Sequence, residues 1–95
     1  MKVIGKRPFC KATVMEIENT LEVLQKEVGG YIETVTFSED CCIICNDEGR
    51  IQGLPYNLRF LGMHFFGTIF FVGVAGDEFT DLNDKQIEII MKNLC

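Results

Sequence analysis

The sequence has few of the residues on which enzymes most often rely. It contains one histidine, His64, and one serine, Ser38. It has no Gly-x-Ser-x-Gly elbow, no P-loop and no pair of histidines at metal-ligand spacing. The adjacent acids Asp47–Glu48 and Asp77–Glu78 leave two-carboxylate chemistry open, although acids in turns are usually solvated. We therefore expect a protein that is not an enzyme and that uses no cofactor.

The sequence also lacks an apolar run long enough to cross a membrane. The longest apolar stretch, Phe60–Ala75, is interrupted by His64, Thr68 and several glycines, short of the roughly 18 uninterrupted apolar residues of a span. The first residues are basic, but no apolar segment follows them as it would in a secretory signal. We expect a cytoplasmic protein without a membrane partner. Ninety-five residues favour a single domain with one core.

Positive charge is scarce beyond the N-terminal segment. The chain has a net charge of −5, and Lys26 is the only basic residue in the acidic stretch of residues 12–49. An acidic protein repels a phosphate backbone and lacks the basic stripe that non-specific nucleic-acid binding requires. We therefore expect no duplex DNA or RNA partner.

Five cysteines raise the question of a disulfide or metal site. If the segment from Cys41 to Asn46 is a strand, Cys41 and Cys45 share one face about 13 Å apart, and Cys42 points to the other face. These three thiols cannot converge on one zinc ion, and Cys10 or Cys95 could join them only from elsewhere in the chain. We expect buried thiols that act as small hydrophobic groups, and no metal site.

Alternation of polar and apolar residues predicts most of the strands. Polar turns at Ser38–Asp40 and Asn46–Gly49 favour a three-stranded antiparallel meander in the middle of the chain. The longest apolar strand is expected near the C-terminal third, ending at Gly76–Glu78. The predicted extended segments are Val3–Ile4, Phe9–Ile17, Tyr31–Phe37, Cys41–Asn46, Arg50–Gln52 and Phe65–Val74.

Two helices are expected from their capping residues. Asn19 with Glu22 forms a capping box for the first helix, although Thr13 with Glu16 allows an earlier start. Gly29–Gly30 ends this helix. Asp81 or Asn83 begins the second helix. The expected inward residues are Leu21, Leu24 and Val28 on the first helix and Leu82, Ile87, Ile90 and Met91 on the second. The sequence thus predicts an α+β fold with a mostly antiparallel sheet of about five strands packed by two helices.

An ordered set of motifs resembles a known family. VGGYIE follows an acidic helix, ICNDEG stands at a hairpin, and GLPYN, GTIFFVG and DLNDKQIEII come after it. In this order they resemble the domain-of-unknown-function family 3846, small proteins of bacteria, phages and other mobile elements. The resemblance covers Val14 to Leu94. It implies an α+β domain in a mobile-element setting, and it implies no reaction.

The segment from Val28 to Asn57 holds most of the turn chemistry, so we expect a binding site there and in the residues just after it. Tyr56 is suited to stacking on a base and Asn57 to pairing with a base edge, whereas Arg50 and Arg59 are suited to neutralising phosphate. Asn46, at the predicted hairpin, joins this set. These residues predict a small non-enzymatic binding module for a small polar or nucleotide-type ligand. A phage-borne module that sequesters a host signal and so modulates host defence would have this chemistry.

Each of these residues also has a structural explanation. Asn57 could cap a turn, Tyr56 could pack on a sheet edge, and Arg59 could pair with an acid. An alternative function is an acidic protein-interaction module that binds a host protein through Glu18, Glu22 and Glu27. It could also self-associate as a homodimer through an aromatic patch, although filling the core is the commoner role of such residues. The residues of this patch would be Phe60, Met63, Phe65 and Phe66.

Overall fold

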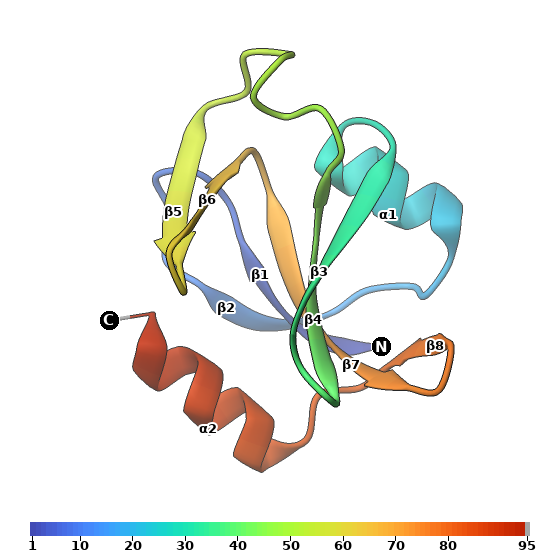
Figure 1. The fold of residues 1–95 in the computed structure, drawn as a ribbon. Helices are drawn as coiled ribbons and strands as arrows, with labels where there is room; N and C mark the ends of the chain where they lie inside the picture. Colours follow the sequence, from blue (N-terminus) through green and yellow to red (C-terminus); the bar gives the residue numbers. More distant parts are fainter. Residues whose placement is uncertain (95) are drawn as a thin grey trace.

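The structure is a computed structural model that describes residues 1–94. Within this range it contains an antiparallel six-stranded sheet, a separate two-stranded sheet and two helices (Figure 1). The predicted α+β class with a mostly antiparallel sheet is confirmed. The elements are β1 (Lys2–Lys6), β2 (Thr13–Glu16), α1 (Leu21–Val28), β3 (Ile32–Ser38), β4 (Cys41–Asn46), β5 (Tyr56–Phe60), β6 (Met63–Phe66), β7 (Ile69–Ala75), β8 (Glu78–Thr80) and α2 (Asp84–Asn93).

Strand β7 lies at the centre of the large sheet. The strand order is β2-β1-β7-β4-β3, and β8 pairs with the second half of β7. Ile4 of β1 stands opposite Phe71, and Ile43 of β4 stands opposite Phe71 on the other side. A strand from the last third of the chain therefore separates the strands from its first half. The edges of the main path are β2 and β3.

The central strands are apolar on both sides because both faces of the sheet are covered. Ile43 and Phe71 belong to one buried cluster, whereas Ile44 and Phe70 belong to the other. Leu24 and Val28 of α1, among other residues, complete the second cluster. Helix α2 and the β5–β6 hairpin cover the opposite face (Figure 1). Continuous apolar strands are expected wherever neither face meets water.

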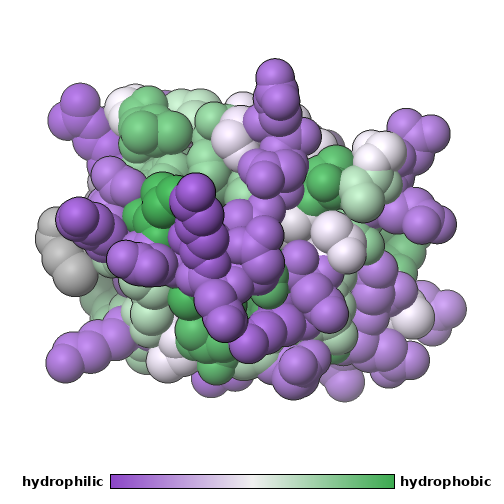
Figure 2. Space-filling model, turned by 90° about the horizontal axis from the view of Figure 1, so that it is seen from below, coloured by the Kyte–Doolittle hydropathy of each residue, from purple (hydrophilic) through white to green (hydrophobic). Residues whose placement is uncertain are grey.

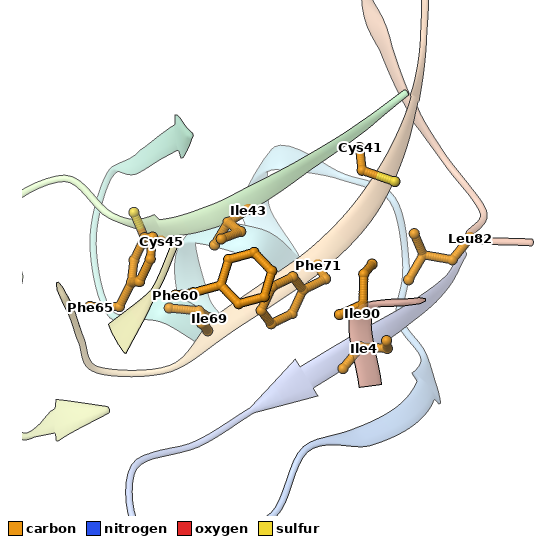
Figure 3. Packing of buried hydrophobic residues seen from close by; sticks show 10 residues of the cluster. All are labelled: Ile4, Cys41, Ile43, Cys45, Phe60, Phe65, Ile69, Phe71, Leu82 and Ile90. Atoms are coloured by element: carbon orange, nitrogen blue, oxygen red, sulfur yellow. The ribbon is translucent and has the colours of Figure 1, made fainter. Parts of the chain in front are cut away.

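Aromatic rings fill the cluster beneath the β5–β6 hairpin. The ring centroids of Phe60 and Phe71 lie 5.1 Å apart, and those of Phe37 and Phe60 lie 5.2 Å apart, both edge to face. Figure 3 shows Phe60 and Phe71 beside each other at the middle of this cluster. Phe60 and Phe65 are buried, so their role in the core is confirmed and the proposed aromatic surface patch is wrong for these two residues.

The predicted meander is wrong in its third strand. Residues 50–52 form consecutive turns, in which Gln52 donates its backbone N–H to Glu48 at 2.8 Å and Leu54 donates to Gly49 at 2.9 Å. Strand β4 instead uses its free edge to pair with β7. The short Arg50–Gln52 segment cannot compete with the longer apolar strand for this edge.

The predicted strand Phe65–Val74 is divided in two. Gly67 has a φ of +81°, and a Cβ at this position would lie 2.7 Å from Leu54 Cδ1. The left-handed backbone at Gly67 turns the chain from β6 into β7. Strand β6 then pairs with β5 in the small sheet, and β7 enters the large one.

The ends of the two helices agree only in part with the predicted capping residues. Asn83 caps α2 with a complete capping box to Gln86, and Gly29 ends α1 with a φ of +81°, as expected. The cap of α1 is Thr20 instead of Asn19, because the Thr20 hydroxyl accepts the Val23 N–H at 3.2 Å. Asn19 instead donates to the carbonyl of Phe79 at 3.1 Å.

Two further details correct the N-terminal expectations. Phe9 lies in a turn with a φ of +65°, so the second strand is only Thr13–Glu16 and does not begin at Phe9. Leu21 is exposed at the start of α1, so it does not join the inward face of the helix. Neither helix in residues 1–94 is long and apolar enough to cross a membrane.

Three cysteines are buried as expected. Cys41 and Cys45 lie in one cluster and Cys42 in the other, which confirms the alternation of their faces. Loss of solvent raises the pKa of the Cys42 and Cys45 thiols to about 11. Cys10 is exposed, so the expectation of burial is wrong there, and Cys95 lies outside the described residues.

Candidate functional site

A groove separates the ends of β3 and β4 from strand β6. We call it the β4–β6 groove. It encloses about 400 Å³, which suits a small molecule. Its walls combine charged, amide and aromatic side chains. The lining residues are Glu33, Val35, Cys45, Asn46, Asp47, Gly49, Arg50, Met63, His64, Phe65 and Phe66.

An aromatic cluster stands at the hairpin side of this groove and consists of Arg50, Tyr56, His64 and Phe66. The Tyr56 and Phe66 ring centroids are 5.4 Å apart, edge to face, and the Arg50 guanidinium lies 5.2 Å from the centre of the Phe66 ring. The Tyr56 hydroxyl lies 3.0 Å from Nδ1 of His64, within hydrogen-bond distance. The cluster thus combines stacking surfaces with a guanidinium held over one of them.

The hairpin register adds Arg59 to the same face. Tyr56 stands opposite Phe66, and Arg59 stands opposite His64. Directly opposed residues of an antiparallel pair project to the same side of the sheet. Arg59 is exposed. The structure therefore brings three of the five predicted residues, Arg50, Tyr56 and Arg59, to one region of the surface.

Asn46 is buried within the turn that follows β4, with 6 % of its surface exposed. Its side-chain N–H groups donate to the Val28 carbonyl at 3.0 Å and to Gln52 Oε1 at 3.2 Å, and its oxygen accepts the Glu48 N–H at 2.7 Å. These bonds tie the end of α1 to the loop that carries Arg50. The position of Asn46 is therefore that of a residue that shapes one wall of the groove.

Asn57 joins three segments of the chain. Its side-chain amide donates to the carbonyls of Lys6 at 2.8 Å and Gly67 at 2.7 Å, and its oxygen accepts a hydrogen bond from Lys6 Nζ at 2.9 Å. These contacts fix the start of β5 against the end of β1 and the bend between β6 and β7. The structure places Asn57 beneath the hairpin and not beside Arg50 or Arg59 on its outer face.

Two carboxylates form the opposite wall of the β4–β6 groove. The pKa of Glu33 is raised above its usual value by partial loss of solvent and by the neighbouring Asp47, through a hydrogen bond and through its charge. The groove therefore has a negative wall at Glu33 and Asp47 and a positive side at Arg50. Its negative wall favours hydrogen-bond donors, and its positive side favours acceptors or anions.

Sequence reasoning did not assign four residues of this region to the binding site: Glu33, Asp47, His64 and Phe66. Their shared signal is position in the strand register. His64 and Phe66 lie two residues apart on β6 and so share a face. Glu33 pairs with Cys45 near the end of β4, and Asp47 follows that end directly. Placing His64 and Phe66 in the site required the β5–β6 pairing, and its Leu61–Gly62 turn lacks the usual hairpin sequence.

The described residues offer no evident metal centre. Among residues 1–94, no three His, Cys, Asp or Glu side chains lie close enough together to hold a metal ion. Cys45 lines the groove, but the carboxylates of Glu33 and Asp47 add to the effect of burial in raising its pKa. Its thiol is therefore protonated near neutral pH and is a poor nucleophile.

The match to a family model covers the whole chain. The model is that of the domain of unknown function DUF3846, and it matches residues 1–95, so the chain belongs to this family. This confirms the resemblance seen in the sequence motifs. No curated protein and no solved structure gives a significant match to the chain.

Proposed function

We propose that the chain is a small non-enzymatic binding module for a nucleotide-type ligand. The observation that carries this proposal is the aromatic cluster, where the Arg50 guanidinium lies 5.2 Å from the Phe66 ring centre beside the Tyr56–His64 pair. Aromatic rings stack on bases of any sequence, and guanidinium groups hold phosphate through paired hydrogen bonds. Arg59, on the same hairpin face, supplies a second guanidinium.

The charges of the groove orient the ligand in this proposal. The phosphate lies near Arg50 and Arg59, away from the carboxylates of Glu33 and Asp47. The base lies against Tyr56 and Phe66, where its N–H groups are available to the carboxylate wall. The hydrogen bonds of Asn46 hold the turn that carries Arg50, and those of Asn57 hold the start of strand β5, which carries Tyr56 and Arg59.

Sequestration is the activity that fits this chemistry best. A protein that binds a ligand without converting it lowers the free concentration of the ligand in proportion to its own abundance. The Cys45 thiol, whose pKa is raised to about 11, is not an activated nucleophile at the groove. In the mobile-element setting that the family resemblance implies, the ligand would be a host signalling nucleotide whose removal modulates host defence.

Titration calorimetry with a panel of linear and cyclic nucleotides tests the proposal. We expect one of them to bind with 1:1 stoichiometry, and Arg59→Ala and Tyr56→Ala each to weaken this binding at least about fivefold, since a phosphate contact or a stacked base contributes about 1 to 3 kcal/mol. Arg7→Ala is the matched control, because Arg7 is exposed but does not lie on the hairpin. Absence of nucleotide binding by the unmodified protein, or equal binding by all three variants, would overturn the proposal.

A further inference from the structure

A second groove lies between α2 and the opposite end of the β5–β6 hairpin. We call it the α2 groove. It encloses about 430 Å³, and its interior is formed mainly by the apolar side chains of Phe37, Cys41, Phe60 and Ile90. Helix α2 lies on the lower side of the molecule, whose surface is mostly hydrophilic with apolar residues visible between the polar ones (Figure 2). The α2 groove is thus a local apolar hollow on a polar face.

Two apolar side chains stand on the rim of this hollow. Leu61 is 63 % exposed at the hairpin turn, and Ile89 is 52 % exposed on α2. These two side chains project from the surface beside the hollow, and both the projections and the hollow are apolar. A patch of this kind fits a partner with a matching patch.

The backbone at Leu61 is strained. Its φ is +49°, and the next residue, Gly62, has a φ of +80°. A two-residue hairpin turn with two positive φ angles normally uses Asn, Asp or Gly, because a branched side chain crowds the left-handed backbone. Leu61 is largely exposed, so contacts within the chain do little to offset this strain. A contact with another molecule would offset it.

The charges on the rim favour a second copy of the chain as the partner. Asp40 and Lys85 both line the α2 groove, and they carry opposite charges. Within residues 1–94 Lys85 makes no ion pair, whereas the Asp40 carboxylate accepts a hydrogen bond from the Ser38 hydroxyl at 3.0 Å. A net charge of −5 makes two copies repel elsewhere. At this rim the charges balance, and each copy offers a cation for the anion of the other.

We propose that the α2 groove is the interface of a two-fold symmetric dimer. Leu61 of each copy inserts into the groove of the other beside Ile89, and Lys85 of each copy faces Asp40 of the other. A two-fold axis uses the same patch twice, so one projection and one recess on each chain satisfy both copies. The α2 groove shares no lining residue with the β4–β6 groove, so the proposed contact uses none of the residues that line the candidate site.

A stable interface buries about 800 Å² on each partner, roughly a seventh of the 5929 Å² surface of this chain, so the dimer would extend beyond the groove to the surrounding surface. The apolar centre around Leu61 and Ile89 with a charged rim at Asp40 and Lys85 also follows the usual arrangement of such interfaces.

Sedimentation velocity over about 1 to 500 μM protein tests the proposal, a range that covers the affinities of weak to moderate dimers. We expect the unmodified protein to dimerise. Leu61→Gly should weaken the dimer at least about tenfold and raise the melting temperature of the dilute monomer, because glycine adopts positive φ without strain. This pairing of weaker association with a more stable fold separates an interface role from a structural one.

Two further variants sharpen the result. Ile89→Glu should also weaken the dimer, whereas Ile51→Glu should leave it unchanged, because Ile51 is even more exposed, at 82 %, but lies outside the groove. Lys85→Asp should weaken association at low salt, and adding Asp40→Lys should restore it. A protein that stays monomeric throughout the concentration range would overturn the proposal. A dimer that is insensitive to Leu61→Gly and Ile89→Glu, or one that Ile51→Glu disrupts, would overturn it as well.

Discussion

The Tyr56 hydroxyl and Nδ1 of His64 lie 3.0 Å apart across the β5–β6 hairpin. One of the two groups donates a hydrogen bond to the other, and the Phe66 ring packs edge-on against Tyr56 from the same face of the hairpin. Two neighbours therefore restrain the orientation of the Tyr56 ring before any ligand arrives. Restraint of this kind reduces the entropy lost when a ligand binds.

Replacing Tyr56 with phenylalanine separates the role of its ring from that of its hydroxyl. If the ring stacks on a base, Tyr56→Phe should weaken nucleotide binding by less than tenfold, because only a half-exposed hydrogen bond worth about 1 kcal/mol is lost. Tyr56→Ala should weaken binding by more, because the stacking surface disappears. Calorimetric titration of both variants gives the comparison. Equal losses in the two variants would show that the hydroxyl, and not the ring, contacts the ligand.

The sequence predicted those elements whose signals are local. Alternation predicted β3, the apolar run predicted β4, and Asn83 was one of the two residues, with Asp81, predicted to begin α2. Pairing partners were harder, because strand β4 pairs with β7 about 30 residues further along the chain, and no local pattern specifies that choice. The meander was predicted because short turns normally join neighbouring strands, and here the longer apolar strand occupies the available edge.

The candidate site was predicted in part for the same reason. Arg50, Tyr56 and Arg59 were identified by residue type, and the fold brings them to one region of the surface. Residue type could not reveal that the polar groups of Asn46 and Asn57 bond to the main chain, because their partners come from distant segments. Glu33 and His64 enter the site only through the register of β3 and β6. Such positions depend on pairings that the sequence pattern leaves open.

The hydrogen bonds of Asn57 should make it one of the more sensitive positions for stability. Asn57→Ala leaves the carbonyls of Lys6 and Gly67 without their side-chain donor. We expect a loss of about 1 to 3 kcal/mol in the free energy of unfolding, the usual cost of an unsatisfied buried polar group. Urea denaturation followed by circular dichroism measures this value. Asn93→Ala is a matched control, because its amide donates within α2 at the surface and should cost less than about 1 kcal/mol.

The Glu33–Asp47 contact should make stability depend on pH. The pKa of Glu33 is raised in the folded protein, so the folded state binds its proton more tightly than the unfolded chain. Stability should therefore increase as the pH falls through the raised pKa toward 4.5, the ordinary value for this carboxyl group. Glu33→Gln should raise the melting temperature at pH 7, and this advantage should disappear below pH 4.5.

Melting curves between pH 4 and 8 check this effect, a range that brackets ordinary and raised carboxyl pKa values. Glu39→Gln removes the same charge just beyond the far end of β3, away from Asp47, so it should not reproduce the pH-dependent advantage. An equal gain from both substitutions would show that net charge, and not the Asp47 contact, determines the difference.

The cysteines should differ in reactivity according to their burial. Cys10 is exposed, whereas burial raises the pKa of the Cys42 and Cys45 thiols to about 11 and leaves little thiolate near neutral pH. Iodoacetamide at pH 8 should modify Cys10 within minutes. It should modify Cys42 and Cys45 only as fast as the protein opens, since β4 must separate from its neighbours before either thiol meets the reagent. Peptide mass mapping over time distinguishes the sites, and urea should abolish the difference.

Because Cys45 lines the β4–β6 groove, modification of Cys45 as fast as Cys10 in the folded protein would show that its thiol is accessible from the groove. It would also remove the basis for excluding a thiol nucleophile there.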